Sequence, residues 1–395
     1  MRTVTAAGLP IGDDHPPRIM GVLNLSEESP YDRSVHADPG EAAAYVDESL
    51  VGEGADIVDV GLESANKRFE VLSAEAELDR LETAVETVAS TSGDVVWSIE
   101  TRYHEVADAA LSAGFDMVND VCGFADPEMP RVCSEYDAAV SKMASPADVK
   151  RPGAVGDGNR AARRADGPAR RCGHADDVYE ALARNGFTDK TLVDPAFGGW
   201  SAAKTLADDR ETFDRLREFR GFGRPILVSI NRKNFLKDVV DRDTDGALPA
   251  SLAATAMAVE RGANVVRTHD VAATRDATRI GHEFTRDRLR DPAAGVAELD
   301  VTTDAEFRRH RDRVARGDGV EADDAVVTRV AEVDLPPVAA EHVATAARRA
   351  GIDVYGDETL LLAGEDPQFR SVRAASNDAP EAAERAIERL SGGFE

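Results

Sequence analysis

Cysteine is scarce in this chain, which has only Cys122, Cys133 and Cys172 among 395 residues. An odd count without a CxxC pair fits the reduced cytosol and excludes a disulfide-stapled secreted domain. No apolar run approaches the roughly 20 residues of a membrane-spanning helix, and the amino terminus has no signal-peptide pattern. We therefore expect a cytoplasmic protein that does not interact with membranes.

Positive charge is also in short supply, because 47 Lys and Arg stand against 74 Asp and Glu, for a formal net charge of −27. No broad basic face is available to neutralise phosphates, which excludes nucleic acid as a partner. An acidic, lysine-poor composition is typical of proteins from salt-loving (halophilic) organisms, in which high ionic strength screens self-repulsion. The protein should lose structure when salt is withdrawn, and a full circular dichroism signal in dilute buffer would contradict this.

What the sequence does contain is a repeated unit. Eight times between Arg18 and Asp270, a short apolar run rich in β-branched residues ends in polar residues and precedes an amphipathic segment. In chain order the runs end at Asn24, Glu63, Glu100, Asn119 with Asp120, Lys142, Asp194, Arg232 with Lys233, and Arg267 with His269 and Asp270. Eight strand–helix units in about 270 residues predict a closed α/β fold, the (β/α)8 TIM barrel. Its active site lies at the carboxyl ends of the strands, so these polar residues are the site candidates.

The amphipathic segments carry helix signals of their own. Asp38 and Ser73 stand where a capping residue is favoured. A glycine follows four of the segments, at Gly54, Gly114, Gly186 and Gly262, where a positive φ is favoured. The expected helices span residues 38–54, 73–89, 104–113, 127–136, 177–185, 209–219, 251–261 and 274–284.

The chain is longer than one barrel of ordinary size, and the strand-ending polar residues stop near residue 290. We therefore expect a barrel over residues 1–290 and an α/β or α+β accessory domain over residues 291–395, for packing or oligomerisation. Its expected helices are residues 304–316, 337–350 and 379–390, and its expected strands are residues 351–355, 359–362 and 369–374.

The strand ends combine carboxylates, amides and cations. Glu100 and Asp194 would accept hydrogen bonds from a donor-rich heteroaromatic edge, while Arg and His side chains would hold phosphate oxygens. The cationic or potentially cationic candidates are Arg232, Lys233, Arg267 and His269. Neither a Walker-type glycine loop nor a GxGxxG follows the first strand, so a plain nucleotide site is not expected.

Six segments at these strand ends resemble, in the same order, the dihydropteroate synthases among the pterin-binding barrel enzymes. They are IMGVLNLS (19–26), DIVDVGLES (56–64), MVNDVCGFADPEM (117–129), VDPAFG (193–198), INRKNF (230–235) and VRTHDV (266–271). The resemblance runs from Arg18 to about Phe284. It implies a transferase of folate biosynthesis, a homodimer, that condenses 6-hydroxymethyl-7,8-dihydropterin diphosphate with p-aminobenzoate and releases diphosphate.

The resemblance also implies roles for the strand-end residues. Glu100, Asn119 and Asp194 would bind the amino-pyrimidinone edge of the pterin, with Lys233 near the ring carbonyl and ring nitrogen. Asn24, Arg267 and His269 would hold the diphosphate, and Asn24 would also bind its Mg²⁺. Lys233, Arg267 and His269 would be the catalytic residues.

Departures from the family pattern cluster where the amine would enter. Residues 26–34 and 64–68 read SEESPYDRS and SANKR in place of TPDSF and STRPG, and Glu100 replaces an aspartate. A ribosylated, phosphorylated aminobenzoate is therefore an alternative acceptor. Asp32 is expected to stand where the family has a loop aspartate. Ala65 and Asn66 replace the family's threonine and arginine, for which Lys67 or Arg68 could substitute, and Asn234 replaces the serine that follows the lysine.

Two other functions stay open, a pterin-dependent methyltransferase of the same barrel family and a non-catalytic pterin-binding paralogue. The cations at the last two strand ends suit a leaving diphosphate and favour the synthase. Residues 150–171, rich in Lys and Arg, form either an anion-gathering lid or an insertion whose charge the acidic surface balances.

Several polar residues have plainer interpretations. Asp59 and Asp120 are expected to cap or bind neighbouring loops, and Lys142 to be a solvated charge at the rim. Cys172 and His174 lack the further partners that a zinc site needs.

Overall fold

The structure, a computed structural model, describes residues 2–26, 34–63, 71–144, 173–198, 204–286, 288, 290–291, 296–297, 299–315, 328–357, 359–376 and 379–391. The chain divides into two compact units, Met1–Ala297 and Glu298–Glu395. Residues 27–33, 64–68 and 150–171 lie outside the described residues, as does Cys172. The expectations for both altered loops and for the lid therefore stay predictions.

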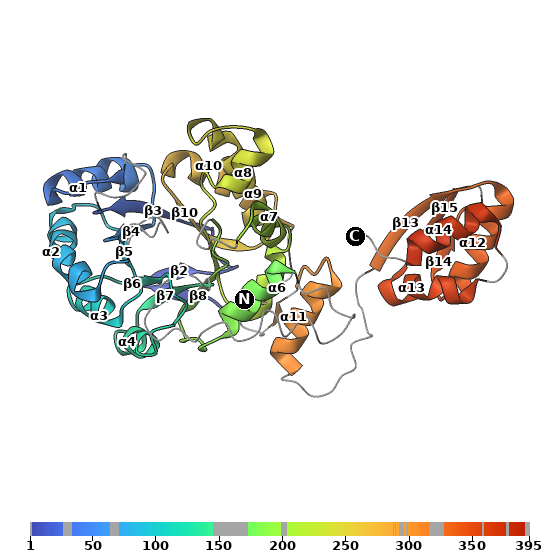
Figure 1. The fold of residues 1–395 in the computed structure, drawn as a ribbon, viewed down its shortest axis with the longest axis horizontal. Helices are drawn as coiled ribbons and strands as arrows, with labels where there is room; N and C mark the ends of the chain where they lie inside the picture. The colour runs from blue at the N-terminus through green and yellow to red at the C-terminus, as the bar shows by residue number, and fades with distance from the viewer. Residues whose placement is uncertain are drawn as a thin grey trace. The chain divides into compact units, whose positions relative to one another are not determined.

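Eight parallel strands close into a barrel, which confirms the predicted fold (Figure 1). They are β3 (Arg18–Asn24), β4 (Ile57–Gly61), β5 (Val96–Thr101), β6 (Met117–Asp120), β7 (Ala139–Met143), β8 (Thr191–Asp194), β9 (Ile226–Val228) and β10 (Ala263–Thr268). Neighbouring strands follow chain order, and β10 closes the ring by pairing with both β9 and β3. All eight carboxyl ends therefore meet at one end of the barrel.

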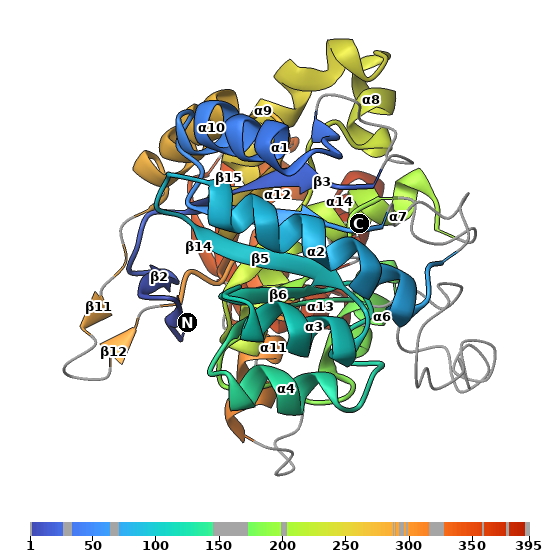
Figure 2. The same cartoon turned by 90° about the vertical axis from the view of Figure 1, so that its left-hand side faces the viewer.

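Helices connect the strands and cover the outside of the barrel, as Figure 2 shows for α2 beside β5. Their bounds are α1 (Pro39–Tyr45), the π-helical η2 (Val46–Val51), α2 (Ala74–Ser90), α3 (His104–Ser112), α4 (Met129–Glu135), α6 (His174–Ala183), α7 (Leu206–Asp214), the 3-10 helices η3 (Leu216–Phe222) and η4 (Asp245–Ala247), α8 (Asn234–Val240), α9 (Leu248–Glu260) and α10 (Val271–Glu283). Each predicted helix is present within a few residues, whereas α8 is absent from the prediction. All four glycines expected after helices have positive φ, from 70° to 106°.

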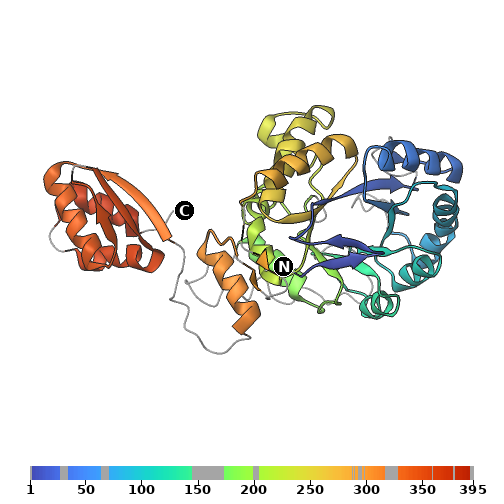
Figure 3. The ribbon, with the colours of Figure 1, turned by 180° about the vertical axis from the view of Figure 1, so that it is seen from behind.

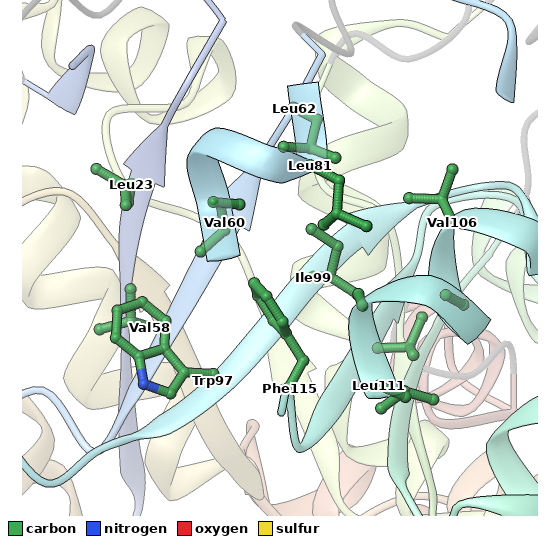
Figure 4. Close-up of a cluster of buried hydrophobic side chains, with 14 of the residues drawn as sticks. Leu23, Val58, Val60, Leu62, Leu81, Trp97, Ile99, Val106, Leu111 and Phe115 are labelled. Atoms are coloured by element: carbon green, nitrogen blue, oxygen red, sulfur yellow. The ribbon is translucent and has the colours of Figure 1, made fainter. Parts of the chain in front are cut away.

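Alternate strand residues face the barrel interior and the helix layer. One residue from each of the eight strands contributes to an apolar layer inside, formed by Met20, Ile57, Val96, Met117, Ala139, Leu192, Leu227 and Val265. The hairpin of β1 (Val4–Ala6) and β2 (Leu9–Ile11) packs against this layer. Figure 4 shows part of the other core, between strands and helices. There the rings of Trp97 and Phe115 pack edge to face, with their centroids 6.3 Å apart. Apolar packing at the amino-terminal end leaves the carboxyl end for polar side chains.

The rest of the first unit adds little to the site. The helices α9 and α10 lie side by side at the outside of the barrel (Figure 3). A short antiparallel pair, β11 (Arg290–Asp291) and β12 (Val296–Ala297), ends the unit. No helix in the described part of the chain is long and apolar enough to cross a membrane.

The second unit contains a three-stranded antiparallel sheet in the order β13-β15-β14. Its elements are α11 (Asp304–Ala315), β13 (Thr328–Asp334), α12 (Pro337–Arg349), β14 (Asp353–Tyr355), β15 (Thr359–Glu365), α13 (Asp366–Ala375) and α14 (Glu381–Ser391). The prediction of a strand over residues 369–374 is wrong, because this segment belongs to α13. Pro367 in the first turn and Gln368, whose Oε1 accepts the Glu365 N–H at 2.6 Å, begin a helix there.

Candidate active site

The strand register aligns three of the predicted site residues across the carboxyl end of the barrel. Asn24 pairs with Gly61, and Gly61 pairs with Glu100. Glu100 pairs in turn with Asn119. These residues stand closer to the carboxyl ends of their strands than the apolar layer does, and therefore above it in the barrel.

Arg267, on β10, is the cation at the centre of this group. Its Nε donates to Asp59 Oδ2 at 2.7 Å, and its Nη2 donates to Glu100 Oε2 at 2.6 Å. The side chain of Arg267 is 15% exposed, and that of Asp59 is fully buried. Although burial opposes the charge, Glu100 and Asp59 raise the pKa of Arg267 above its ordinary value. The guanidinium is therefore a permanent positive charge between two carboxylates.

Asp59, on β4, accepts hydrogen bonds from three side chains. Ser98 Oγ donates to Oδ1 at 2.7 Å, while Asn119 Nδ2 at 2.9 Å joins Arg267 at Oδ2. The interpretation of Asp59 as a loop-binding residue is therefore wrong. The alternation of Ile57, Asp59 and Gly61 toward the interior is the sequence signal that would have placed it correctly.

The hydrogen bond to Asp59 also orients the amide of Asn119. Because a carboxylate only accepts, Asn119 must turn its NH₂ group toward Asp59 and its carbonyl oxygen away. Within the described residues nothing donates to that oxygen, nor to Glu100 Oε1. Both oxygens are thus available to the donors of a ligand.

Asp194 and Lys233 add one carboxylate and one amino group to the site. Asp194 ends β8, where its Oδ1 accepts the Ala196 N–H at 2.7 Å, and burial raises its pKa to about 6. Lys233 precedes α8, and burial together with Arg267 lowers its pKa to about 8. Gly198, at φ +117°, lets the loop after β8 approach the lysine, because a Cβ there would lie 3.2 Å from Lys233 Nζ. Between these pKa values Asp194 is ionised and Lys233 is protonated.

His269 follows β10 and is neutral at pH 7. Burial, with Arg267 and Lys233 nearby, lowers its pKa to about 3. In the substrate-free protein it is therefore a neutral hydrogen-bonding group, unlike the potential cation considered from the sequence. A bound anion would raise this pKa.

Asn24, at the end of β3, has a suitable oxygen for a metal ion. Its Nδ2 donates to Ser34 Oγ at 2.7 Å, which leaves Oδ1 as the acceptor. A Cβ on Gly61 would lie 3.2 Å from Oδ1, so the glycine leaves space beside this oxygen. A single amide oxygen fits Mg²⁺, which takes oxygen ligands and completes its shell with water and substrate phosphates.

Two other strand-end candidates stabilise loops. Arg232 forms a bidentate ion pair with Asp270, at 2.8 and 2.9 Å, and its Nη1 donates to Thr244 O at 2.6 Å. Asp120 accepts the backbone N–H groups of Cys122 at 2.7 Å and Phe124 at 2.5 Å, as expected for a loop-binding residue. These groups tie loops together at the carboxyl end of the barrel.

Lys142 is fully buried, so its interpretation as a solvated rim charge is wrong. On β7, Ala139 belongs to the interior layer, so Lys142, three residues on, points outward beneath the helices. Its Nζ donates to the carbonyls of Leu182 at 3.0 Å and Gly186 at 2.7 Å, and also to that of Arg184. Strand alternation is again the signal that would have placed it.

A cluster of His104, Glu105 and Asp126 is the one group in the described part of the chain with metal-ligand geometry. Asp126 accepts the His104 N–H at 3.0 Å, His104 Nδ1 at 2.8 Å and the Glu128 N–H at 3.0 Å. These bonds hold the starts of α3 and α4 together, so loop packing accounts for the cluster.

Comparison with known proteins agrees with this geometry. The family model described as pterin binding enzyme matches residues 20–269. The chain is 35% identical over 268 residues, 68% of its length, to a probable bifunctional folylpolyglutamate synthase/dihydropteroate synthase of Halobacterium salinarum, and it spans only 31% of that relative. It is 30% identical over 280 residues to the inactive dihydropteroate synthase 2 of Mycobacterium tuberculosis, 69% of this chain and 83% of that protein.

A solved structure of a dihydropteroate synthase is also similar to this chain. The dihydropteroate synthase of Coxiella burnetii in complex with pteroic acid superposes with a TM-score of 0.57 at 28% identity, over 71% of this chain and 98% of that one. Residues 20–269, which the family model matches, include the carboxyl ends of all eight barrel strands. This chain belongs to the family of pterin binding enzymes.

Proposed function

We propose that the protein condenses 6-hydroxymethyl-7,8-dihydropterin diphosphate with p-aminobenzoate or a related aromatic amine and releases diphosphate. One observation carries the proposal: acceptor oxygens of Glu100, Asn119 and Asp194 occupy the barrel end that also holds Arg267 and Lys233. A ligand with a donor-rich ring and a dianion fits such a site.

The pterin ring would be held by the acceptors. Glu100 Oε1, Asn119 Oδ1 and the Asp194 carboxylate would accept from the amino and ring N–H groups, and Lys233 would donate to the ring carbonyl. These bonds replace water around the ring and fix the direction of its methylene carbon. The ring can then supply electron density to that carbon.

The reaction breaks the bond between this carbon and the diphosphate oxygen, and forms a bond to the amine nitrogen, which loses a proton. Arg267 would stabilise the negative charge that grows on the leaving diphosphate, and neutral His269 would add a hydrogen bond. Asn24 would hold Mg²⁺, which supplies further charge neutralisation on the diphosphate. No side-chain nucleophile is required.

The assay that tests the proposal supplies dihydropterin diphosphate, Mg²⁺ and candidate amines at high salt, and follows diphosphate release and product mass. Release with a matching product mass is expected. Binding without release for every amine would instead identify a non-catalytic pterin-binding protein. Methyl transfer from a methylated tetrahydropterin would identify the methyltransferase.

The pH dependence of the reaction should follow Asp194 and Lys233. Above about pH 6 Asp194 is ionised and can accept from the ring, and below about pH 8 Lys233 is protonated and can donate. We expect kcat/KM, which reports the free enzyme, to rise through the first value and fall through the second. Asp194→Asn should remove the acidic limb, and a profile flat from pH 5 to pH 9 would contradict both assignments.

The remaining attributes are also proposals. We propose a cytoplasmic homodimer that works at high ionic strength, with residues 291–395 as its accessory domain. The net charge of −27 supports the salt requirement. Met257, Ile280 and Phe284, which are 46–78% exposed on or next to the adjacent helices α9 and α10, support a dimer surface there.

A further inference from the structure

The two carboxylates that hold Arg267 differ in how firmly they are held themselves. Asp59 is fully buried, and both of its oxygens accept from side chains on three strands. Glu100 is 10% exposed, and Arg267 Nη2 is its one hydrogen-bond donor within the described residues. Asp59 is therefore a fixed partner of Arg267, whereas Glu100 has room to change partners.

In the substrate-free protein, Glu100 and Arg267 each use one polar atom on the other. Glu100 would accept from the pterin and Arg267 would bind the diphosphate, but Oε2 of the carboxylate and Nη2 of the guanidinium are bonded to each other at 2.6 Å, which leaves Oε1 alone for a pterin donor. Burial raises the pKa of Glu100, which means that its carboxylate needs a positive or donor partner to stay charged there. A pterin N–H can replace Arg267 in that task.

We propose that Arg267 exchanges partners when substrate binds: it keeps Asp59 through Nε, and the pterin ring displaces it from Glu100, which frees Nη2 for the diphosphate. Asp59 is thus a positioning residue on which the guanidinium turns, and it fixes the Asn119 amide at the same time. This inference rests on the proposed function. It couples the two ends of one substrate, because each end binds better when the other is present.

The coupling can be measured without turnover. Titration calorimetry at fixed ionic strength would follow binding of inorganic pyrophosphate with Mg²⁺, in the absence and presence of 6-hydroxymethylpterin, which carries no phosphate. In the wild type, the pterin should tighten pyrophosphate binding about fivefold or more. If both ligands bind with no effect on each other, the exchange is refuted while the proposed function stands.

Glu100→Gln gives the sharpest test, because it predicts a gain. With the carboxylate charge removed, Arg267 is released in advance, so pyrophosphate alone should bind about fivefold more tightly than to the wild type, and the pterin effect should disappear. Asp59→Asn should do the opposite and weaken pyrophosphate binding with or without pterin. Pyrophosphate affinity unchanged or lower in Glu100→Gln overturns the proposal.

Glu63→Gln is the matched control. Glu63 lies just beyond β4, is also 10% exposed, and also forms a 2.6 Å ion pair, with Arg102. The Glu63→Gln substitution should leave pyrophosphate binding unchanged. If Glu100→Gln does not fold by circular dichroism, Glu100→Asp serves instead, since the shorter side chain draws the carboxylate away from Arg267 by one methylene. Failure of 6-hydroxymethylpterin to bind would count against the proposed function. The exchange of partners would still be decided by the pyrophosphate affinities of the wild type and of Glu100→Gln, measured without pterin.

Discussion

Lys233→Ala should lower kcat/KM by about a thousandfold while the protein stays folded. The substitution removes a charged donor from a site where burial lowers its pKa to about 8, which leaves it protonated at pH 7. Loss of one such preorganised donor costs about 10²–10³ in rate, and more when binding of the ring also suffers. Steady-state kinetics of diphosphate release, with a thermal melt of each variant, measures this.

Lys237→Ala is the control for that substitution. Lys237 lies one turn further along α8, where its Nζ donates to Thr244 Oγ1 at 3.0 Å at the surface. It should leave kcat/KM within about a factor of two, since an exposed hydrogen bond contributes little. A folded Lys233→Ala protein with unchanged turnover would remove Lys233 from the site.

Arg267→Ala should abolish turnover as well, but it tests the site less cleanly. It would leave Asp59 and Glu100 without their counter-ion inside the barrel. Removing one partner of a buried ion pair costs about 3–5 kcal/mol of stability. Lost activity in this variant would therefore combine two causes, which melting curves separate.

Lys142→Met should have the largest effect on stability away from the site, a loss of about 3 kcal/mol in the free energy of unfolding. Methionine fills a similar volume but leaves the carbonyls of Leu182, Arg184 and Gly186 without their donor in a buried position. Urea unfolding at constant high salt measures the difference.

Lys190→Met is the comparison for Lys142. Lys190 also donates to a backbone carbonyl, Asp137 O at 2.7 Å, but its side chain is 26% exposed. Water can replace the lysine there, so the loss should stay below about 1 kcal/mol. Equal losses in the two variants would show that burial of Lys142 adds nothing to its hydrogen bonds.

The barrel could be predicted because its signals are local. Parallel strands buried on both faces read as continuous apolar runs, and helices such as α2 begin at capping residues such as Ser73. The elements of the C-terminal unit are harder to predict from the sequence because its strand signals are weaker. The segment around Phe369 is apolar enough for a strand, and the turn at Pro367 and Gln368 decides for a helix.

The site residues also divide into those that the sequence places and those that it misplaces. The sequence predicts the residues at the strand ends, because the apolar runs end there; they include Asn24, Glu100, Asn119 and Asp194. Asp59 and Lys142 are misplaced by the sequence, because their polarity indicates a loop and the rim although strand alternation buries both.

The sequence by itself determined the barrel, the end at which the candidate site residues gather and the types of polar groups found there. Only the tertiary structure decided which of these groups are partners. Barrel closure brings Arg267 to Asp59 and Glu100, which lie 208 and 167 residues away in the chain. Charge pairing depends on distances of a few ångströms and on burial, and both are set by strand register around the closed ring rather than by spacing along the sequence.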